Sequence, residues 1–279
     1  MSNMSTPQTL EVPGYQVVQY LGSGARSTIW QVRDRQSNEQ FALKRVLKKQ
    51  AADMRFIEQA INEYEVASQL DAPNIRKIYH LRRVKEWLRI REVHLVMELC
   101  DGNTVQSARP TAIPEVIRIF QEVASALAYI NSRGFVHADM KPNNILVNGK
   151  GKVKIIDLGQ SCPIGTTKER IQGTPDFIAP EQVYRRPLDA RTDVFNYAAS
   201  LYWTLTGKAI PTVLPKKGSG LSLMTDLAIT PPEQVNPEIP LPLSRLVTDC
   251  LKINPNQRPS TMADVVSRLD LIAHTLKEG

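Results

Sequence analysis

Near residue 100 the hydrophobic pattern of this 279-residue chain changes character. Before this point, short runs of β-branched and apolar residues follow one another and predict strands, with one helical stretch among them. Beyond it, apolar residues recur at helical spacing over long segments. The chain therefore divides into a mostly β part and a larger helical part. The segment Cys100–Asn103, which contains Gly102, is a candidate hinge between them.

The pattern also predicts the individual elements. In the first part we expect three consecutive antiparallel strands, then a helix, then two more strands, over Tyr15–Leu21, Ile29–Asp34, Gln40–Val46, Asp53–Leu70, Ile75–Arg82 and Val93–Leu99. In the second part we expect a helix from Pro114 to near Gly134, an almost wholly apolar helix over Asp193–Thr206 that Gly207 closes, and an amphipathic helix over Thr261–Leu276. Residues 208–240 are rich in Pro and Gly and predict little regular structure.

Composition excludes several classes of protein. Hydrophobic residues make up 42% and charged residues 23%, as in ordinary soluble globular domains. No apolar run reaches the roughly 20 residues of a membrane helix, and we expect residues 1–14 to form a flexible tail. Three widely spaced cysteines indicate no disulfide framework and favour a cytoplasmic location. The net charge is +7, with basic residues clustered over Arg76–Arg91. We interpret this cluster as a solvated surface or one with affinity for acidic proteins, and expect no nucleic-acid binding.

One segment in the second part combines several polar groups within apolar surroundings. Asp139, Lys141 and Asn144 lie between Val136 and Val147, and phosphoryl transfer has a use for each of them. Asp139 can accept the proton of an attacking hydroxyl, Lys141 can neutralise phosphate charge, and Asn144 can bind a metal. Asp157 follows a β-branched run and is well placed to hold Mg²⁺. This set predicts a phosphotransfer site.

Two features of the first part can serve the same chemistry. The glycine-containing turn Gly22–Ser27 is by itself consistent with an ordinary hairpin, although two glycines also let backbone N–H groups approach phosphates. Lys44 follows an apolar run and can point inward only if a carboxylate or a phosphate meets it. Glu63 on the expected helix can supply the carboxylate, whereas Glu65 points to a different helix face.

These motifs together resemble the eukaryotic-type Ser/Thr protein kinase family, and most closely its bacterial branch. The resemblance rests on GSGARS at 22–27, FALK at 41–44, Glu63, HADMKPNN at 137–144, DLG at 157–159, GTPDFIAPE at 173–181 and NPNQRPS at 254–260. It implies an α+β bilobal fold, with a β-rich N-lobe that holds one major helix and a larger α-helical C-lobe. The expected parts are the tail 1–14, the N-lobe 15–102 and the C-lobe 103–279 of one kinase domain, with ATP at the hinge.

The resemblance also implies roles for individual residues. Asp139 would be the catalytic base and Lys141 the phosphate lysine, while Lys44 and Glu63 would form an ion pair and Thr174 would contact the base and Lys141. Asn144 and Asp157 would bind Mg²⁺, which Mn²⁺ can replace. Glu181 and Arg258 match a buried ion pair, and Asp193 a support of the catalytic loop. ATP contacts are expected at Leu21, Gly22, Ser23, Gly24, Ala25, Arg26, Ser27, Ile29, Ala42, Lys44, Met97, Glu98, Cys100 and Leu146.

Departures from the family pattern add two expectations. Ala138 stands where many kinases have an Arg that receives an activation-loop phosphate, so we expect activity without phosphorylation between Ser161 and Thr174. Kinases that select Arg in a substrate resemble one another in having Glu where this chain has Asn143 and another acidic residue near where it has Trp203, so we expect no strong demand for Arg upstream of the acceptor. Leu158 replaces the usual Phe of the DFG motif, and activity should survive this change.

The expected function is transfer of the γ-phosphate of Mg-ATP to protein Ser or Thr hydroxyls, with autophosphorylation and possible homodimers. A pseudokinase or scaffold that binds nucleotide without turnover is the alternative, although the residues whose loss would favour it are all present. A small-molecule phosphotransferase usually lacks the Ala179–Glu181 segment and its partner Arg258, both of which are present here. An interaction module independent of ATP has only the basic surface in its favour.

Overall fold

The computed structural model describes residues 10–24, 26–212, 214 and 228–278. These residues form two compact units, each with its own internal contacts. The first unit extends up to Ser68 and also includes Arg76–Cys100, whereas the second includes Gln69–Ile75 and the chain from Asp101 onward. The last of the three boundaries between the units, after Cys100, falls within the segment Cys100–Asn103.

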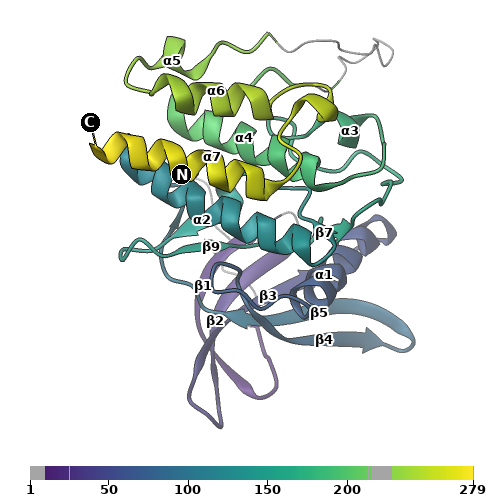
Figure 1. Cartoon of the computed structure of the whole chain (residues 1–279). Coiled ribbons are helices and arrows are strands. Elements are labelled where there is room, and N and C mark those ends of the chain that lie inside the picture. The colour runs from purple at the N-terminus through teal and green to yellow at the C-terminus, as the bar shows by residue number, and fades with distance from the viewer. Residues whose placement is uncertain (1–9, 25, 213, 215–227, 279) are drawn as a thin grey trace, which may run out of the picture. The chain divides into compact units, whose positions relative to one another are not determined.

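The first unit contains a five-stranded antiparallel sheet in the order β1-β2-β3-β5-β4 (Figure 1). Its strands are β1 Tyr15–Gly24, β2 Ser27–Asp34, β3 Gln40–Leu47, β4 Ile78–Glu86 and β5 Arg89–Glu98. All five predicted strands are confirmed, but β4 begins three residues later than expected and runs on to Glu86. The reason is that β4 and β5 form one long hairpin in which Glu86 pairs with Arg89.

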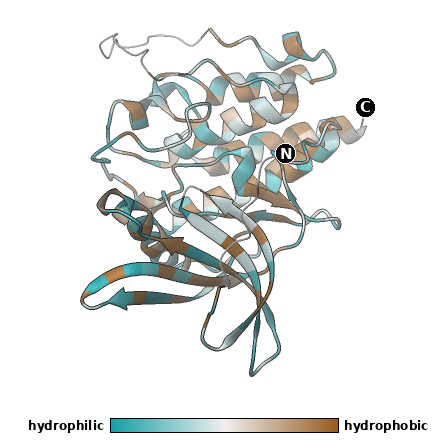
Figure 2. Cartoon of the chain, turned by 180° about the vertical axis from the view of Figure 1, so that it is seen from behind, coloured by the Kyte–Doolittle hydropathy of each residue, from teal (hydrophilic) through white to brown (hydrophobic). Residues whose placement is uncertain are grey.

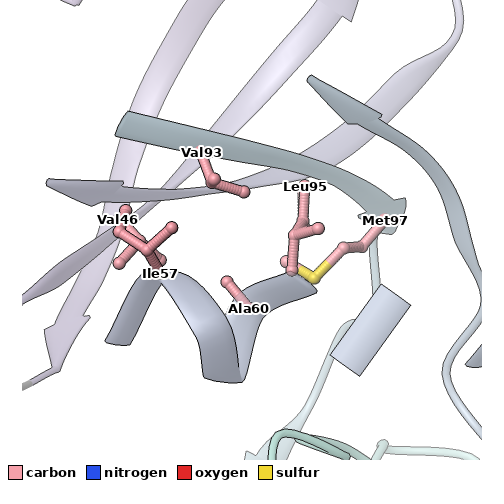
Figure 3. Close-up of a cluster of buried hydrophobic side chains, with 7 residues drawn as sticks. Val46, Ile57, Ala60, Val93, Leu95 and Met97 are labelled. Carbon is pink, nitrogen blue, oxygen red and sulfur yellow. The ribbon is translucent and has the colours of Figure 1, made fainter. Parts of the chain in front are cut away.

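Helix α1 (Met54–Ala67) follows the 3₁₀ turn η1 (Ala51–Asp53) and covers one face of the sheet. Figure 3 shows Ile57 and Ala60 of α1 against side chains of β3 and β5. Each large aliphatic side chain buried in this way contributes about 1.5–3 kcal/mol to folding. The cluster consists of Ala42, Val46, Ile57, Ala60, Val93, Leu95 and Met97. Packing on this cluster holds α1 against the strand that carries Lys44.

A second cluster lies around Trp30 and includes residues from the segment expected to be a tail. Leu10 and Val12 are 7% and 6% exposed and pack in the cluster that contains Trp30 and Leu43. Burial of two large apolar side chains stabilises this part of the chain against the sheet. The packed region therefore begins before Tyr15, where the sequence pattern had placed its start.

The second unit is mostly helical, as predicted. Its helices are α2 Ile113–Ser132, α3 Pro180–Val183, α4 Ala190–Thr206, α5 Pro232–Val235, α6 Leu241–Cys250 and α7 Met262–Glu278. Helix α4 is almost entirely buried, and Gly207 ends it with φ 71° in the left-handed region, which confirms both expectations. Short strands β6 (Asn103–Thr104), β8 (Ile145–Val147) and β9 (Val153–Ile155) form one small sheet, and β7 (Phe135–Val136) pairs with β10 (Cys162–Pro163).

These short strands position the polar segment that the sequence singles out. Strand β7 precedes it, and the 3₁₀ turn η2 (Pro142–Asn144) leads from it into β8. Strand β9 pairs with β8 and ends at Ile155, two residues before Asp157. Across the ranges that the structure covers, no helix has both the length and the apolar character to cross a membrane.

Candidate functional site

In the first unit, Lys44 and Glu63 form the predicted ion pair. Lys44 lies on β3 opposite Leu95 of β5, and its Nζ is 2.6 Å from Oε2 of Glu63 on α1. Glu63 is only 1% exposed, so its charge requires compensation. A guanidinium nitrogen of Arg76 lies 3.6 Å from the other carboxylate oxygen, Oε1. Arg76 was not among the predicted site residues, because a basic residue just before a strand gives no sequence signal of a buried ion pair.

The predicted glycine loop is the turn between β1 and β2, where Gly24 pairs with Ser27. Leu21 is 44% exposed, and Gly22 has φ 157°, close to extended backbone. The Nε of Arg26 donates to Oδ1 of the buried Asp53 at 2.9 Å. This side chain is therefore held by a partner inside the first unit. Ala25, also predicted to contact ATP, lies outside the described residues.

Some of the residues predicted to contact ATP belong to the apolar core. Ala42 and Met97 belong to the cluster beneath α1, and Ile29 packs against it. The N–H of Glu98 donates to the carbonyl of Lys77 at 2.9 Å, and the half-buried Cys100 follows at the end of the first unit. Leu146 lies in the second unit, on β8, where it pairs with Lys154 and Thr104.

In the second unit, Asp139, Lys141 and Thr174 form a closed triangle of hydrogen bonds. Lys141 Nζ donates to Asp139 Oδ2 at 2.7 Å and to Thr174 Oγ1 at 2.8 Å. The hydroxyl of Thr174 in turn donates to Asp139 Oδ1 at 3.1 Å. Burial raises the pKa of Asp139 above its ordinary value, while Lys141 and the hydroxyl of Thr174 oppose this shift. The structure thus brings Thr174 together with two predicted residues, Asp139 and Lys141, that precede it by more than 30 positions.

The two predicted metal ligands, Asn144 and Asp157, lie on neighbouring backbone segments. The N–H of Ile156 donates to the carbonyl of Asn144 at 2.9 Å, and Asp157 is the next residue along the chain. The Nδ2 of Asn144 donates to the carbonyl of Asp139 at 2.8 Å, which commits the nitrogen end of the amide and leaves its oxygen as the ligand atom. Asp157 has φ 70°, a strained conformation that persists only where its surroundings enforce it. An amide oxygen and a carboxylate fit a hard cation such as Mg²⁺.

Asp193 supports the loop that carries Asp139, as the resemblance implied. Its carboxylate accepts the N–H groups of His137 and Ala138, both at 2.9 Å, and Nδ2 of Asn131 at 2.8 Å. Ala138 has φ 60°, so these bonds fix a strained turn. Burial raises the pKa of Asp193 to about 6, although the three donors act in the opposite direction. Burial also lowers the pKa of His137 to about 4.

A second buried network joins the segment after Thr174 to helix α4. Glu181 and Arg258 form a bidentate pair at 2.8 and 3.0 Å. Gln182, beside Glu181, donates to the carbonyl of Ala138 at 2.7 Å and accepts from Nδ2 of Asn196 at 3.0 Å. The Glu181–Arg258 pair is the buried ion pair that the resemblance to protein kinases implied. Gln182 was missed because a lone Gln gives no sequence signal of a long-range contact.

Most of the chain matches the model of a known protein family. A family model described as a protein kinase domain matches residues 15–268. The chain belongs to the protein kinase family. The β-rich first unit and the helical second unit are accordingly the N-lobe and C-lobe of a kinase fold.

Curated relatives include kinases of animals and of bacteria. Sperm motility kinase 2B of Mus musculus is 29% identical over 90% of this chain and 50% of its own length. A probable serine/threonine-protein kinase of Clostridium acetobutylicum is 25% identical over 91% of this chain and 39% of its own. Serine/threonine-protein kinase PknD of Chlamydia pneumoniae is 25% identical over 90% of this chain and 30% of its own length. The chain thus spans half or less of the length of these three relatives.

Proposed function

We propose that this kinase domain transfers the γ-phosphate of Mg-ATP to Ser and Thr hydroxyls of proteins, including its own. The observation that carries the proposal is the triangle of Asp139, Lys141 and Thr174. A largely buried carboxylate held by an ammonium and a hydroxyl is fixed in orientation, which a group that must accept a proton at a defined place requires. The serine/threonine kinases among the relatives support the same acceptor chemistry.

Each site residue has a separate role in the proposed phosphate transfer. Asp139 accepts the proton of the acceptor hydroxyl, and Lys141 stabilises negative charge on the transferred group. Asn144 and Asp157 would hold the metal through an amide oxygen and a carboxylate. Lys44, which Glu63 orients within the N-lobe, would contact the phosphates of bound ATP. When bound, Mg-ATP supplies the phosphoryl group and the cation that neutralises its charge.

A single comparison tests the proposal. The chain and an Asp139→Asn variant are incubated with Mg-ATP and a generic acceptor protein, and phosphorylated residues are identified by mass spectrometry. We expect phosphoserine and phosphothreonine from the unmodified chain, and a loss of about a thousandfold in the variant because the proton acceptor is removed. Asp249→Asn, a change in a half-exposed ion pair with Arg268, serves as the matched control and should keep its activity.

The alternative of a nucleotide-binding pseudokinase makes a different prediction for the same samples. Titration calorimetry with Mg-ATP would then show binding to the unmodified chain and to Asp139→Asn, with no phosphate transfer by either. Such a result would contradict the proposed activity while leaving the fold intact. Phosphotyrosine as the main product would contradict the assignment of the acceptor.

A finer proposal concerns the peptide acceptor. Asn143 is exposed in the turn after Lys141, and Trp203 is half-buried on α4, so neither position presents a carboxylate. We expect no strict requirement for Arg upstream of the acceptor, since a guanidinium would find no negative partner at these two positions. A peptide array that showed strict Arg selection would contradict this expectation.

A further inference from the structure

The turn between β4 and β5 (Figure 1) exposes two large apolar residues side by side. Trp87 and Leu88 are 96% and 95% exposed. In the part of the chain that the structure describes, the next most exposed large apolar side chain is Leu271, at 69%. An isolated exposed leucine needs no explanation, but an adjacent Trp–Leu pair at the apex of a protruding hairpin is a candidate interaction surface.

The backbone at this apex is held in a conformation that does not suit tryptophan. Glu86 pairs with Arg89, so Trp87 and Leu88 are the two central residues of a tight hairpin turn. Trp87 has φ 55°, and glycine is the residue that such a first turn position favours. An L-residue with a large side chain costs free energy there, and strain of this kind points to a function of the side chain itself.

The apex is surrounded by positive charge. Residues 48–51 and 82–91 contain seven basic residues and one acidic residue, Glu86, which pairs with Arg91 at 3.1 Å, so their formal charge is +6. Figure 2 shows hydrophilic and hydrophobic bands mixed along the hairpin. A hollow of about 620 Å³ beside the turn is lined by residues 48–51 and 86–91. The basic residues are Lys48, Lys49, Arg82, Arg83, Lys85, Arg89 and Arg91.

We propose that this hairpin binds the surface of an anionic lipid bilayer. Trp87 and Leu88 enter the interfacial layer, where tryptophan is favoured, and the surrounding Lys and Arg side chains contact the lipid phosphates. Each cationic side chain near an anionic surface adds attraction, so the seven act together. A convex apolar apex fits a deformable layer better than the flat or convex surface of an acidic protein, which would leave both apolar side chains in water. The proposal is independent of the proposed catalytic activity.

Binding to vesicles tests the proposal directly. The whole chain is sedimented with phosphatidylcholine vesicles that contain or lack phosphatidylglycerol, and tryptophan emission is recorded. Trp30 is buried and Trp203 half-buried, so a blue shift on adding vesicles reports mainly on Trp87. We expect binding only with phosphatidylglycerol, with a blue shift, and weaker binding as salt is raised.

Three variants distinguish this mechanism from nonspecific adsorption to vesicles. Trp87→Gly with Leu88→Ser removes the apolar apex while placing the favoured residue at the strained position, so the hairpin keeps its fold. It should bind at least about tenfold more weakly. Lys85→Glu with Arg89→Glu, the charge-reversal variant, should abolish binding to the anionic vesicles. Leu271→Ser, which removes an exposed leucine from α7, should bind as the unmodified chain does.

Other outcomes would overturn the proposal. They are equal binding to vesicles without phosphatidylglycerol, unchanged binding by the apex variant, or no binding at all. Retention on a polyglutamate resin without vesicle binding, lost in the charge-reversal variant but kept in the apex variant, would assign the basic surface to an acidic protein instead.

Discussion

The guanidinium of Arg258 is fully buried and makes five hydrogen bonds. Two of them go to the carboxylate of Glu181 and three to backbone carbonyls. A buried charge of this kind is tolerated only because every donor is satisfied. At the residue scale, the C-lobe therefore depends on complete pairing of a few buried ions.

Removal of Glu181 tests this dependence. We expect Glu181→Ala to lower the free energy of unfolding by about 3–5 kcal/mol, because it leaves the Arg258 charge buried without its partner. Chemical denaturation measures the change. Asp249→Ala breaks the half-exposed pair with Arg268 and should cost at most about 1 kcal/mol. Equal costs for the two variants would contradict the argument.

His137 should make stability depend on pH. Its pKa in the folded chain is lowered to about 4 by burial, whereas the unfolded residue titrates near about 6.5. As the pH falls through the range between these values, the unfolded chain takes up a proton that the folded chain does not, so stability is lost. Linkage gives a loss of about 2 kcal/mol between about pH 7 and pH 5 from this residue.

The variant His137→Asn removes the titrating group, and its side-chain oxygen can accept the N–H that His137 Nδ1 accepts from Asp139. Denaturation of both proteins across this pH range isolates the effect. Asp193, whose pKa is raised, makes the folded chain more stable as the pH falls, but both proteins contain Asp193 and so share this effect. Parallel pH profiles would show that His137 does not contribute in this way.

At the scale of elements, Gly102 fixes how the first residues of the C-lobe pass strand β8. It has φ 116°, and a Cβ at this position would lie 2.3 Å from the carbonyl oxygen of Val147. The backbones at Gly102 and Val147 cannot move apart without displacing β8, the strand that directly follows Asn144. Only glycine fits this close approach.

We expect Gly102→Ala to destabilise the chain by about 2 kcal/mol or more, through the clash and the positive φ together. Gly149→Ala is the matched control, since nothing lies within 4 Å of the added methyl group and no positive φ is required there. Thermal denaturation distinguishes the two. A neutral Gly102→Ala would show that the strand can shift to make room.

The sequence patterns predicted most elements for a physical reason. Strands and long helices bury one face, so their apolar residues recur at a fixed period that needs no knowledge of the partner. Helix α6 was not predicted because it begins in a proline-rich stretch that masks its short apolar stripe. Arg76 and Gln182 were missed because their importance lies in contacts with Glu63 and Ala138, which folding alone brings near.

At the scale of the whole molecule, the loop after Asp157 bears on regulation. Ser161 is only 1% exposed, and its hydroxyl donates to the carbonyl of His137 at 3.4 Å. A kinase could not phosphorylate the hydroxyl of Ser161 unless this loop opened. Ala138 offers no cation to a phosphate added nearby, so phosphorylation here has no evident receptor at that position.

If the chain has the proposed activity, we expect the triple variant of Ser161, Thr166 and Thr167 to Ala to keep its rate within about tenfold of the unmodified chain. Steady-state kinetics on one acceptor protein provides the measurement, with peptide mass spectrometry identifying which residues of this loop carry phosphate in the unmodified chain. The double variant of Thr166 and Thr167 alone controls for loss of the buried Ser161 bond. A fall of about a hundredfold or more in both variants would contradict the expectation.

The position of Glu63 between two cations has a pharmacological consequence. Inhibitors that require α1 to move away from its sheet must separate this carboxylate from Lys44 and also from Arg76. Compounds of that class should therefore bind this chain poorly, whereas compounds that leave the helix in place avoid the penalty. Arg76 would then add to the selectivity between the two classes, beyond what the Lys44 pair contributes.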